Sequence, residues 1–131
     1  MKDYADYPKH SSFEDLKGKV FTRVETDEVD YINFYLNDGE RFSLRHDQSC
    51  CESVYIESIE GDLQDLVDSL ILIAEEAQPE DQALNDYDES FTWTFYKLAT
   101  VKGYVTIRWY GTSNGCYSEE ASLYYEKIEK K

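Results

Sequence analysis

Two stretches rich in β-forming residues meet in the middle of residues 91–110, and this arrangement constrains the fold more than any other feature of the chain. Phe, Trp, Tyr, Thr, Val and Ile are concentrated in both stretches, and Gly103 at their junction can adopt the positive φ of a tight turn. The pattern predicts an antiparallel hairpin. If Lys102 and Gly103 form a two-residue loop, Leu98 lies opposite Ile107 on the face that enters the core.

The opposite face of this hairpin combines aromatic rings with two bases. In the same register Lys97 lies directly across from Arg108, where like charges are unfavourable, and a three-residue loop would separate them. One interpretation is that each base pairs with a carboxylate on a neighbouring strand. The other is an anion site that holds a nucleotide or phosphate by stacking and charge. The residues predicted for this ligand site are Trp93, Phe95, Lys97, Arg108 and Tyr110.

The formal net charge of the 131-residue chain is −15, and it is concentrated in one region. Residues 46–96 contain fourteen Asp and Glu and no Lys or Arg, whereas the remainder has fourteen acids and thirteen bases. The general interpretation is a well-solvated surface. The functional interpretation is a surface that binds basic grooves, as a nucleic acid does, and that repels nucleic acid itself. Its predicted contact residues are Asp62, Asp65, Asp68, Glu75, Glu76, Glu80, Asp81, Asp86, Asp88 and Glu89.

The length allows one domain with a sizeable core. We expect the α+β class: a mostly antiparallel, strongly twisted sheet of about six to eight strands, with two short helices covering an end or a face. The alternative is a partly closed β-barrel. Residues 1–11 are polar and irregular and are predicted to form a flexible arm, so that the single α+β domain spans residues 12–128.

Local signals support individual elements of this fold. The tripeptide at residues 37–39, Asn-Asp-Gly, predicts the turn of a second hairpin between residues 31–36 and 40–46. A short helix is expected at residues 12–18, where Ser12 is a candidate N-cap. A second helix is expected at residues 62–69 because apolar residues recur there with helical spacing.

Three cysteines and two histidines offer a candidate metal centre. The number of cysteines is odd and Cys50 and Cys51 are adjacent, which is unfavourable for a set of disulfides. Free thiols are therefore expected. His46, Cys50 and Cys51 are weak candidates for zinc ligands, because no second pair of ligands follows at a usual spacing. A further alternative is that His46 and Cys50 form a nucleophilic pair, although the sequence shows no oxyanion hole to accompany it. We expect no metal and no cofactor.

Other classes of protein have little support in the sequence. No apolar run approaches the roughly 18 residues of a membrane span, and the first residues lack the pattern of a signal peptide, so a cytoplasmic location is expected. Neither GxGxxG nor a P-loop occurs, and in so acidic a chain pairs of carboxylates identify no acid–base dyad. The sequence therefore indicates a protein that is not an enzyme.

The segments HDQSCCESVYIESIEGDLQDLVDS and SFTWTFYKLATVKGYVTIRWYGTSNGCYSE resemble a domain-of-unknown-function family of small phage and prophage proteins. The resemblance extends over about residues 13–128. Two positions differ from the family pattern: Ser49 replaces an acid in the first segment, and Cys116 precedes Tyr117 where the family has two tyrosines. The resemblance implies a phage origin and a role inside a bacterial host, and it brings no activity with it.

Three functional hypotheses follow. The leading one is a non-enzymatic inhibitor that binds the basic groove of a bacterial host protein, of the anti-CRISPR or anti-restriction type, by nucleic-acid mimicry and without binding nucleic acid or membrane. The second is a protein that binds or sequesters a nucleotide through Lys97, Arg108 and the neighbouring rings. The third is a metal-stabilised structural domain. The aromatic outer face of the central hairpin would also suit a homodimer.

Overall fold

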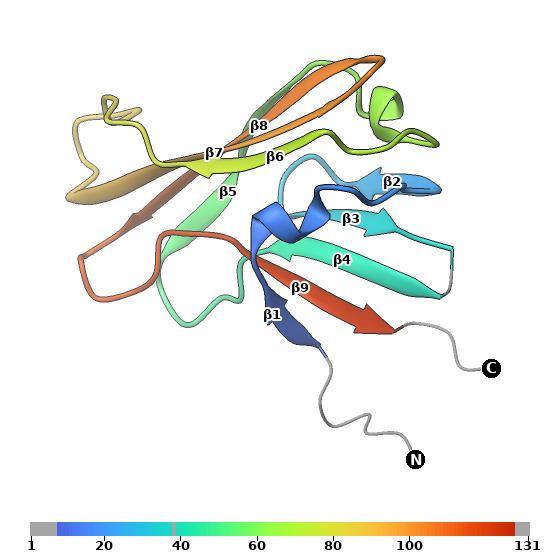
Figure 1. Cartoon of the computed structure of the whole chain (residues 1–131). Coiled ribbons are helices and arrows are strands. Elements are labelled where there is room, and N and C mark those ends of the chain that lie inside the picture. The colour runs from blue at the N-terminus through green and yellow to red at the C-terminus, as the bar shows by residue number, and fades with distance from the viewer. Residues whose placement is uncertain (1–7, 38, 128–131) are drawn as a thin grey trace.

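The computed structural model describes residues 8–37 and 39–127, and these form two antiparallel β-sheets that enclose a common core (Figure 1). One sheet has five strands in the order β1-β9-β4-β3-β2, and the other has four in the order β5-β8-β7-β6. The strands are β1 (Lys9–Ser11), β2 (Arg23–Thr26), β3 (Tyr31–Tyr35), β4 (Glu40–Arg45), β5 (Ser53–Glu60), β6 (Ile73–Ala77), β7 (Ser90–Thr100), β8 (Gly103–Ser113) and β9 (Ser122–Lys127).

The predicted α+β class with two short helices is wrong. Within the described ranges the helical elements are two 3₁₀ turns, η2 (Phe13–Leu16) and η3 (Leu63–Leu66). The nine described strands also exceed the expected number, and they form two open sheets instead of one sheet or a partly closed barrel.

Tertiary pairing explains why the second predicted helix stops after one turn. Val67 is extended and forms a β-bridge with Phe21, and Leu70 forms another with Val20. Asp68 between them has a φ of 61°, in the left-handed region. Contacts with the segment before β2 therefore override the helical spacing of the apolar residues.

Apolar side chains from both sheets meet between them. Tyr96, Leu98 and Ile107 of the central hairpin point inward and are at most 1% exposed. Phe34 and Leu44 of the opposite sheet are fully buried, as are Leu16 of η2 and Leu66 of η3. The face of the central hairpin that was expected to enter the core does enter it, and the two 3₁₀ turns pack against the same core.

The central hairpin, β7 and β8, has a different register from the one that the Lys102-Gly103 loop implies. Leu98 pairs with Val105, and Thr100 pairs with Gly103, so the loop consists of residues 101 and 102. The Thr100 hydroxyl accepts a hydrogen bond from the Lys102 N–H at 3.1 Å and donates one to the Asp65 carbonyl at 2.6 Å, which fixes this turn. Every side chain keeps its predicted face, because the partners shift by two residues.

The second hairpin is confirmed. Strands β3 and β4 pair antiparallel, with Phe34 opposite Phe42 and Ile32 opposite Leu44. The Leu36 N–H donates to the Glu40 carbonyl at 2.9 Å across the turn, whose residue Asp38 lies outside the described ranges.

Part of the predicted flexible arm forms a strand. Residues 1–7 of the predicted flexible arm, and residue 128 of the predicted domain, lie outside the described ranges. Residues 9–11 of that arm form β1, which pairs with β9 (Figure 1). Among the described residues no helix has the length and apolar character that a membrane crossing requires.

Candidate functional site

The ten acidic residues predicted to contact a partner lie on three segments that belong to or adjoin the four-stranded sheet. Three belong to η3 or flank it, two lie on the edge strand β6, and five lie in the loop of residues 78–89 that follows β6. In Figure 1, η3 and this loop are at opposite ends of β6. Eight of the ten side chains are exposed, and Asp65 and Asp88 are half-buried. We call these ten residues the acidic surface.

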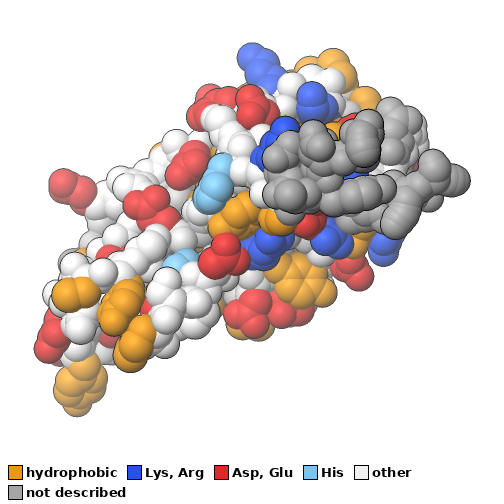
Figure 2. All heavy atoms as spheres, turned by 90° about the horizontal axis from the view of Figure 1, so that it is seen from below, with side chains coloured by type: hydrophobic (Ala, Val, Ile, Leu, Met, Phe, Trp, Pro, Cys, Tyr) orange, Lys and Arg blue, Asp and Glu red, His pale blue; other side chains and the backbone are white. Residues whose placement is uncertain are grey.

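The acidic surface has no ion-pair partner among the bases that the structure describes. The ion pairs formed between described residues include none of its ten members. Acids of the five-stranded sheet behave differently: Glu126 pairs with both Arg41 and Arg45, and Glu40 pairs with Lys127. Figure 2 shows Lys and Arg side chains gathered on one part of the molecule, beside the grey residues, with acids spread over the remainder. Among the described residues, the ion pairs thus involve acids outside the acidic surface, and the ten carboxylates of this surface keep their charge.

Glu75 and Glu76 extend the acidic surface to both sides of β6. Glu75 pairs in register with Lys97, and Glu76 with the inward-facing Tyr96. The pKa of the Glu76 carboxyl is raised by partial burial and, to a lesser degree, by the carboxylates of Glu120 and Glu14. Glu76 therefore adds a carboxylate on the inner side of this edge strand, close to two other carboxylates.

The loop of residues 78–89 packs over the outer face of the central hairpin. The indole N–H of Trp93 donates to the Gln82 carbonyl at 3.0 Å, and the Leu84 N–H donates to the Tyr110 hydroxyl at 2.9 Å. That hydroxyl donates in turn to the Asp88 carboxylate at 2.5 Å. Burial, followed by this bond, raises the pKa of Tyr110 to about 12. The loop of residues 78–89 is thus anchored at three points.

The two bases of the predicted ligand site are not brought together. Lys97 lies opposite Thr106, and Arg108 lies opposite Phe95, so the predicted pairing of Lys97 with Arg108 is wrong. The Arg108 guanidinium lies 5.0 Å from the ring centre of Trp93 and 4.9 Å from that of Phe95.

Arg108 also has carboxylate partners. It forms ion pairs with Glu57 at 3.7 Å and Glu60 at 3.5 Å, as the first interpretation of this base expects. Trp93 and Tyr110 are 4% and 2% exposed beneath the acidic loop. The aromatic surface expected to hold a nucleotide, or to form a dimer contact, is therefore largely covered by the chain itself.

The loop between β4 and β5 contains the three candidate metal ligands, His46, Cys50 and Cys51. Their side chains contact other protein groups. The Nδ1 atom of His46 lies 2.9 Å from the Glu120 carbonyl, and its Nε2 atom lies 2.6 Å from a carboxylate oxygen of Glu52. A disulfide joins Cys50 to Cys51, so the expectation of free thiols is wrong for these two residues, whereas Cys116 is free and exposed. No group of three or more His, Cys, Asp or Glu in the described part of the chain is arranged to hold a metal ion.

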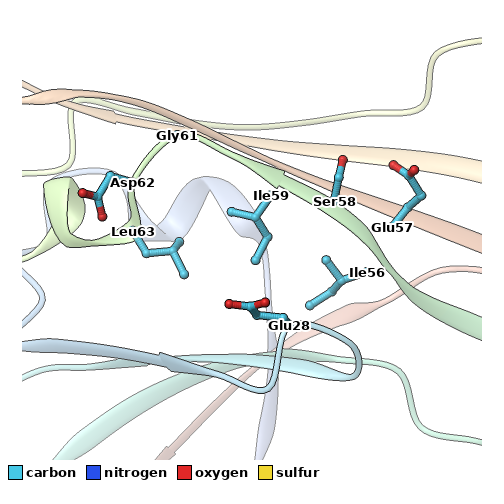
Figure 3. Close-up of a pocket in the computed structure, with 8 residues that line it drawn as sticks. All are labelled: Glu28, Ile56, Glu57, Ser58, Ile59, Gly61, Asp62 and Leu63. Atoms are coloured by element: carbon cyan, nitrogen blue, oxygen red, sulfur yellow. The ribbon is translucent and has the colours of Figure 1, made fainter.

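A groove that the sequence did not reveal lies between β5 and the turn that joins β2 to β3 (Figure 3). Its cavity volume is about 500 Å³. Ile56, Ile59 and Leu63 supply apolar walls, and Asp62 brings the acidic surface to its rim. In Figure 3 the carboxylate of Glu28 extends toward Ile59 and Leu63. The groove therefore combines an apolar floor with a carboxylate inside it.

Glu28 is held in place by the polar groups that precede it. Its backbone N–H donates to the Thr26 hydroxyl at 2.8 Å, and the Asp27 carboxylate accepts the N–H groups of Val29 and Asp30. These bonds accompany a φ of 68° at Glu28, which a non-glycine residue adopts only at a cost. From the sequence, residues 27 and 28 look like an ordinary polar bend, and no local signal reveals that the groove lies beside them.

The shape of the groove also depends on a bulge in β5 and on the turn at the end of this strand. The strand has a bulge between Ile56 and Ser58, and the Ile56 N–H donates to the Val29 carbonyl at 2.7 Å. At the end of β5, Gly61 has a φ of 102°, and a Cβ there would lie 2.3 Å from the Tyr104 carbonyl oxygen. Only glycine allows this close turn, after which Asp62 accepts the Gln64 N–H at 2.9 Å and begins η3. The turn places Leu63 against the groove.

Comparison with known families gives one match. A family described as a domain of unknown function, DUF7448, matches residues 14–123. No curated protein and no solved structure matches the chain.

Proposed function

The chain belongs to the DUF7448 family of domains of unknown function, and we propose that it is a non-enzymatic binding protein that occupies a basic, nucleic-acid-binding surface of a partner protein. The observation that carries this proposal is the acidic surface. It contains ten carboxylates on η3, β6 and the loop of residues 78–89, and none of them forms an ion pair with a described base.

The proposed mechanism is electrostatic and steric. Carboxylates on η3, β6 and the loop of residues 78–89 pair with Lys and Arg of the partner and exclude nucleic acid from the same surface. Because most of these carboxylates are exposed, their contribution weakens as salt screens the charges. The chain itself does not bind DNA or RNA, since its net charge of −15 repels phosphates.

The resemblance of the motifs to phage and prophage proteins supports a more specific proposal. The partner is a bacterial host protein that handles nucleic acid or defends the cell, such as a component of CRISPR or restriction machinery, and the chain acts in the host cytoplasm. Nucleic-acid mimicry suits such partners because their function depends on a basic groove.

Two structural details favour a binding role over catalysis. Both ring nitrogens of His46 are engaged by Glu52 and Glu120, so this ring is not offered to a substrate. The cysteines beside it are joined to each other. The second hypothesis, nucleotide binding at Arg108, is less favoured because Glu57 and Glu60 pair with this base.

Capture from a bacterial lysate tests the proposal. Tagged wild-type chain is expected to retain a protein at low salt, and this protein is expected to be released by added duplex DNA and by high salt. Charge reversal of Glu75, Glu76, Glu80 and Asp81 is expected to abolish capture. Reversal of Asp30, which is exposed but outside the acidic surface, serves as the control. The proposal would be contradicted if the charge-reversed variant retained the same protein. It would also be contradicted if added DNA did not release the protein from the wild-type chain.

A further inference from the structure

We propose that the groove beside Glu28 binds the side chain of a Lys or Arg presented by the partner protein. This inference rests on the proposed function, because the side chain belongs to the partner's basic surface. The groove meets the acidic surface at Asp62, so one partner can contact both.

The apolar part of the groove suits the aliphatic stem of such a side chain. Ile56 is buried in the floor, and Ile59 and Leu63 are only partly buried, so apolar surface faces the cavity. Lys and Arg pack their methylene groups on apolar surface while keeping the charged end at a polar group. The volume of about 500 Å³ is ample for one long side chain with part of its backbone.

The carboxylate of Glu28 supplies the charge complement. It extends toward the apolar residues of the groove (Figure 3), and it forms no ion pair with any base in the described ranges. The backbone of the turn that carries it is held by the bonds to Thr26 and Asp27. Asp62 at the rim adds a second negative charge. By contrast, the carboxylate of Glu57 points away from the cavity and pairs with Arg108.

Other occupants fit these residues less well. The lining residues include no base, so a phosphate or nucleotide would meet only carboxylates. An uncharged apolar segment would cover Glu28 without giving its carboxylate a partner, which is costly. A cation on an aliphatic stem satisfies both parts of the groove at once.

Methyl NMR on the full chain tests this inference with defined probes. We expect N-acetyl-lysine methylamide and N-acetyl-arginine methylamide to shift the methyl signals of Ile56, Ile59 and Leu63 in a saturable way. The norleucine analogue, which has the stem without the charge, should produce much smaller shifts. Glu28→Gln should weaken binding of the cationic probes about three- to fivefold, the upper part of the range for loss of one exposed ion pair.

Asp30→Asn is the matched control, because it removes the same charge from an exposed residue in the same turn and should leave the affinity within about twofold. Groove methyls that respond equally to the lysine and norleucine probes would overturn the inference. It would also be overturned if the probes shifted only amides of β6 and residues 78–89, an outcome that leaves the proposed function standing. Saturable binding of the cationic probes in the groove would support the groove proposal. If lysate capture were at the same time unaffected by charge reversal of the acidic surface, the proposed function would be rejected.

Discussion

The Nε2 atom of His46 lies 2.6 Å from the Oε2 atom of Glu52, and the two side chains are only 6% and 0% exposed. The backbone N–H groups of Ser49 and Cys50 donate to the same carboxylate at 2.8 and 2.9 Å. Together these bonds, led by that from Ser49, lower the pKa of Glu52 to about 2. The pair therefore ties the end of β4 to the loop that enters β5.

The first prediction concerns the pH dependence of this tie. Because folding lowers the pKa of Glu52, its contribution to stability is fully present above the unfolded-state pKa of about 4.3 and is lost as the pH falls toward 2. Glu52→Gln should lower the urea midpoint at pH 7, and the difference from wild type should shrink between about pH 5 and pH 2. Glu120→Gln keeps the carbonyl that contacts His46 and should have little effect. A difference that is constant with pH would contradict this account.

The second prediction concerns the anchoring of the acidic loop. Tyr110→Phe removes the hydroxyl that accepts the Leu84 N–H and donates to Asp88, and should cost about 1 kcal/mol. Hydrogen exchange of the Leu84 amide should become faster, because this amide loses its partner. Tyr104→Phe on the same strand changes a side chain that is 70% exposed and should have neither effect. Unchanged exchange at Leu84 would show that the loop is held in another way.

The third prediction tests the close contact of β8 with the segment before β9. A Cβ at Gly111 would lie 2.0 Å from the Glu119 carbonyl oxygen, so Gly111→Ala must displace backbone. We expect a loss of about 3 kcal/mol or more in the free energy of unfolding. At Gly103 the nearest atom is an oxygen of the movable Asp65 side chain at 2.9 Å, so Gly103→Ala should cost clearly less. If denaturant unfolding gave equal losses of stability for Gly111→Ala and Gly103→Ala, this close contact at Gly111 would be contradicted.

The fourth prediction separates stability from binding at Glu28. This residue has a φ of 68°, where glycine is free of the steric cost paid by other residues. Glu28→Gly should therefore raise the free energy of unfolding by about 1 kcal/mol and weaken binding of the lysine probe. Glu28→Gln should weaken binding without the gain in stability. A destabilised glycine variant would show that the Glu28 side chain supports the turn.

The sequence predicts the strands better than the larger architecture. Alternation of apolar residues identifies the inward face of the central hairpin, and the turn at Asn37 and Gly39 identifies the second hairpin. The register of the first hairpin is missed because its turn is fixed by a distant contact, the bond from Thr100 to the Asp65 carbonyl. The helical spacing after Asp62 is misleading for a similar reason, since Val67 pairs with Phe21.

The candidate site was predicted in part. The acidic residues are evident from composition alone, because their regional excess does not depend on the fold. The groove is not evident, since Glu28 and Leu63 are far apart in the chain and only the packing of two sheets brings them together. The sequence leaves a ligand site on the aromatic face as one of two interpretations, because nothing local indicates that residues 78–89 return to cover Trp93.

Competition with duplex DNA for the purified partner tests the central claim most directly. With the partner captured as described above, its affinity for a fluorescent DNA duplex is measured at increasing concentrations of the chain. We predict that the chain raises the apparent Kd for DNA in proportion to its concentration, and that this effect weakens with salt. Reversal of Glu75, Glu76, Glu80 and Asp81 should abolish the effect. A ternary complex in which the partner binds DNA equally well with the chain present would contradict the claim.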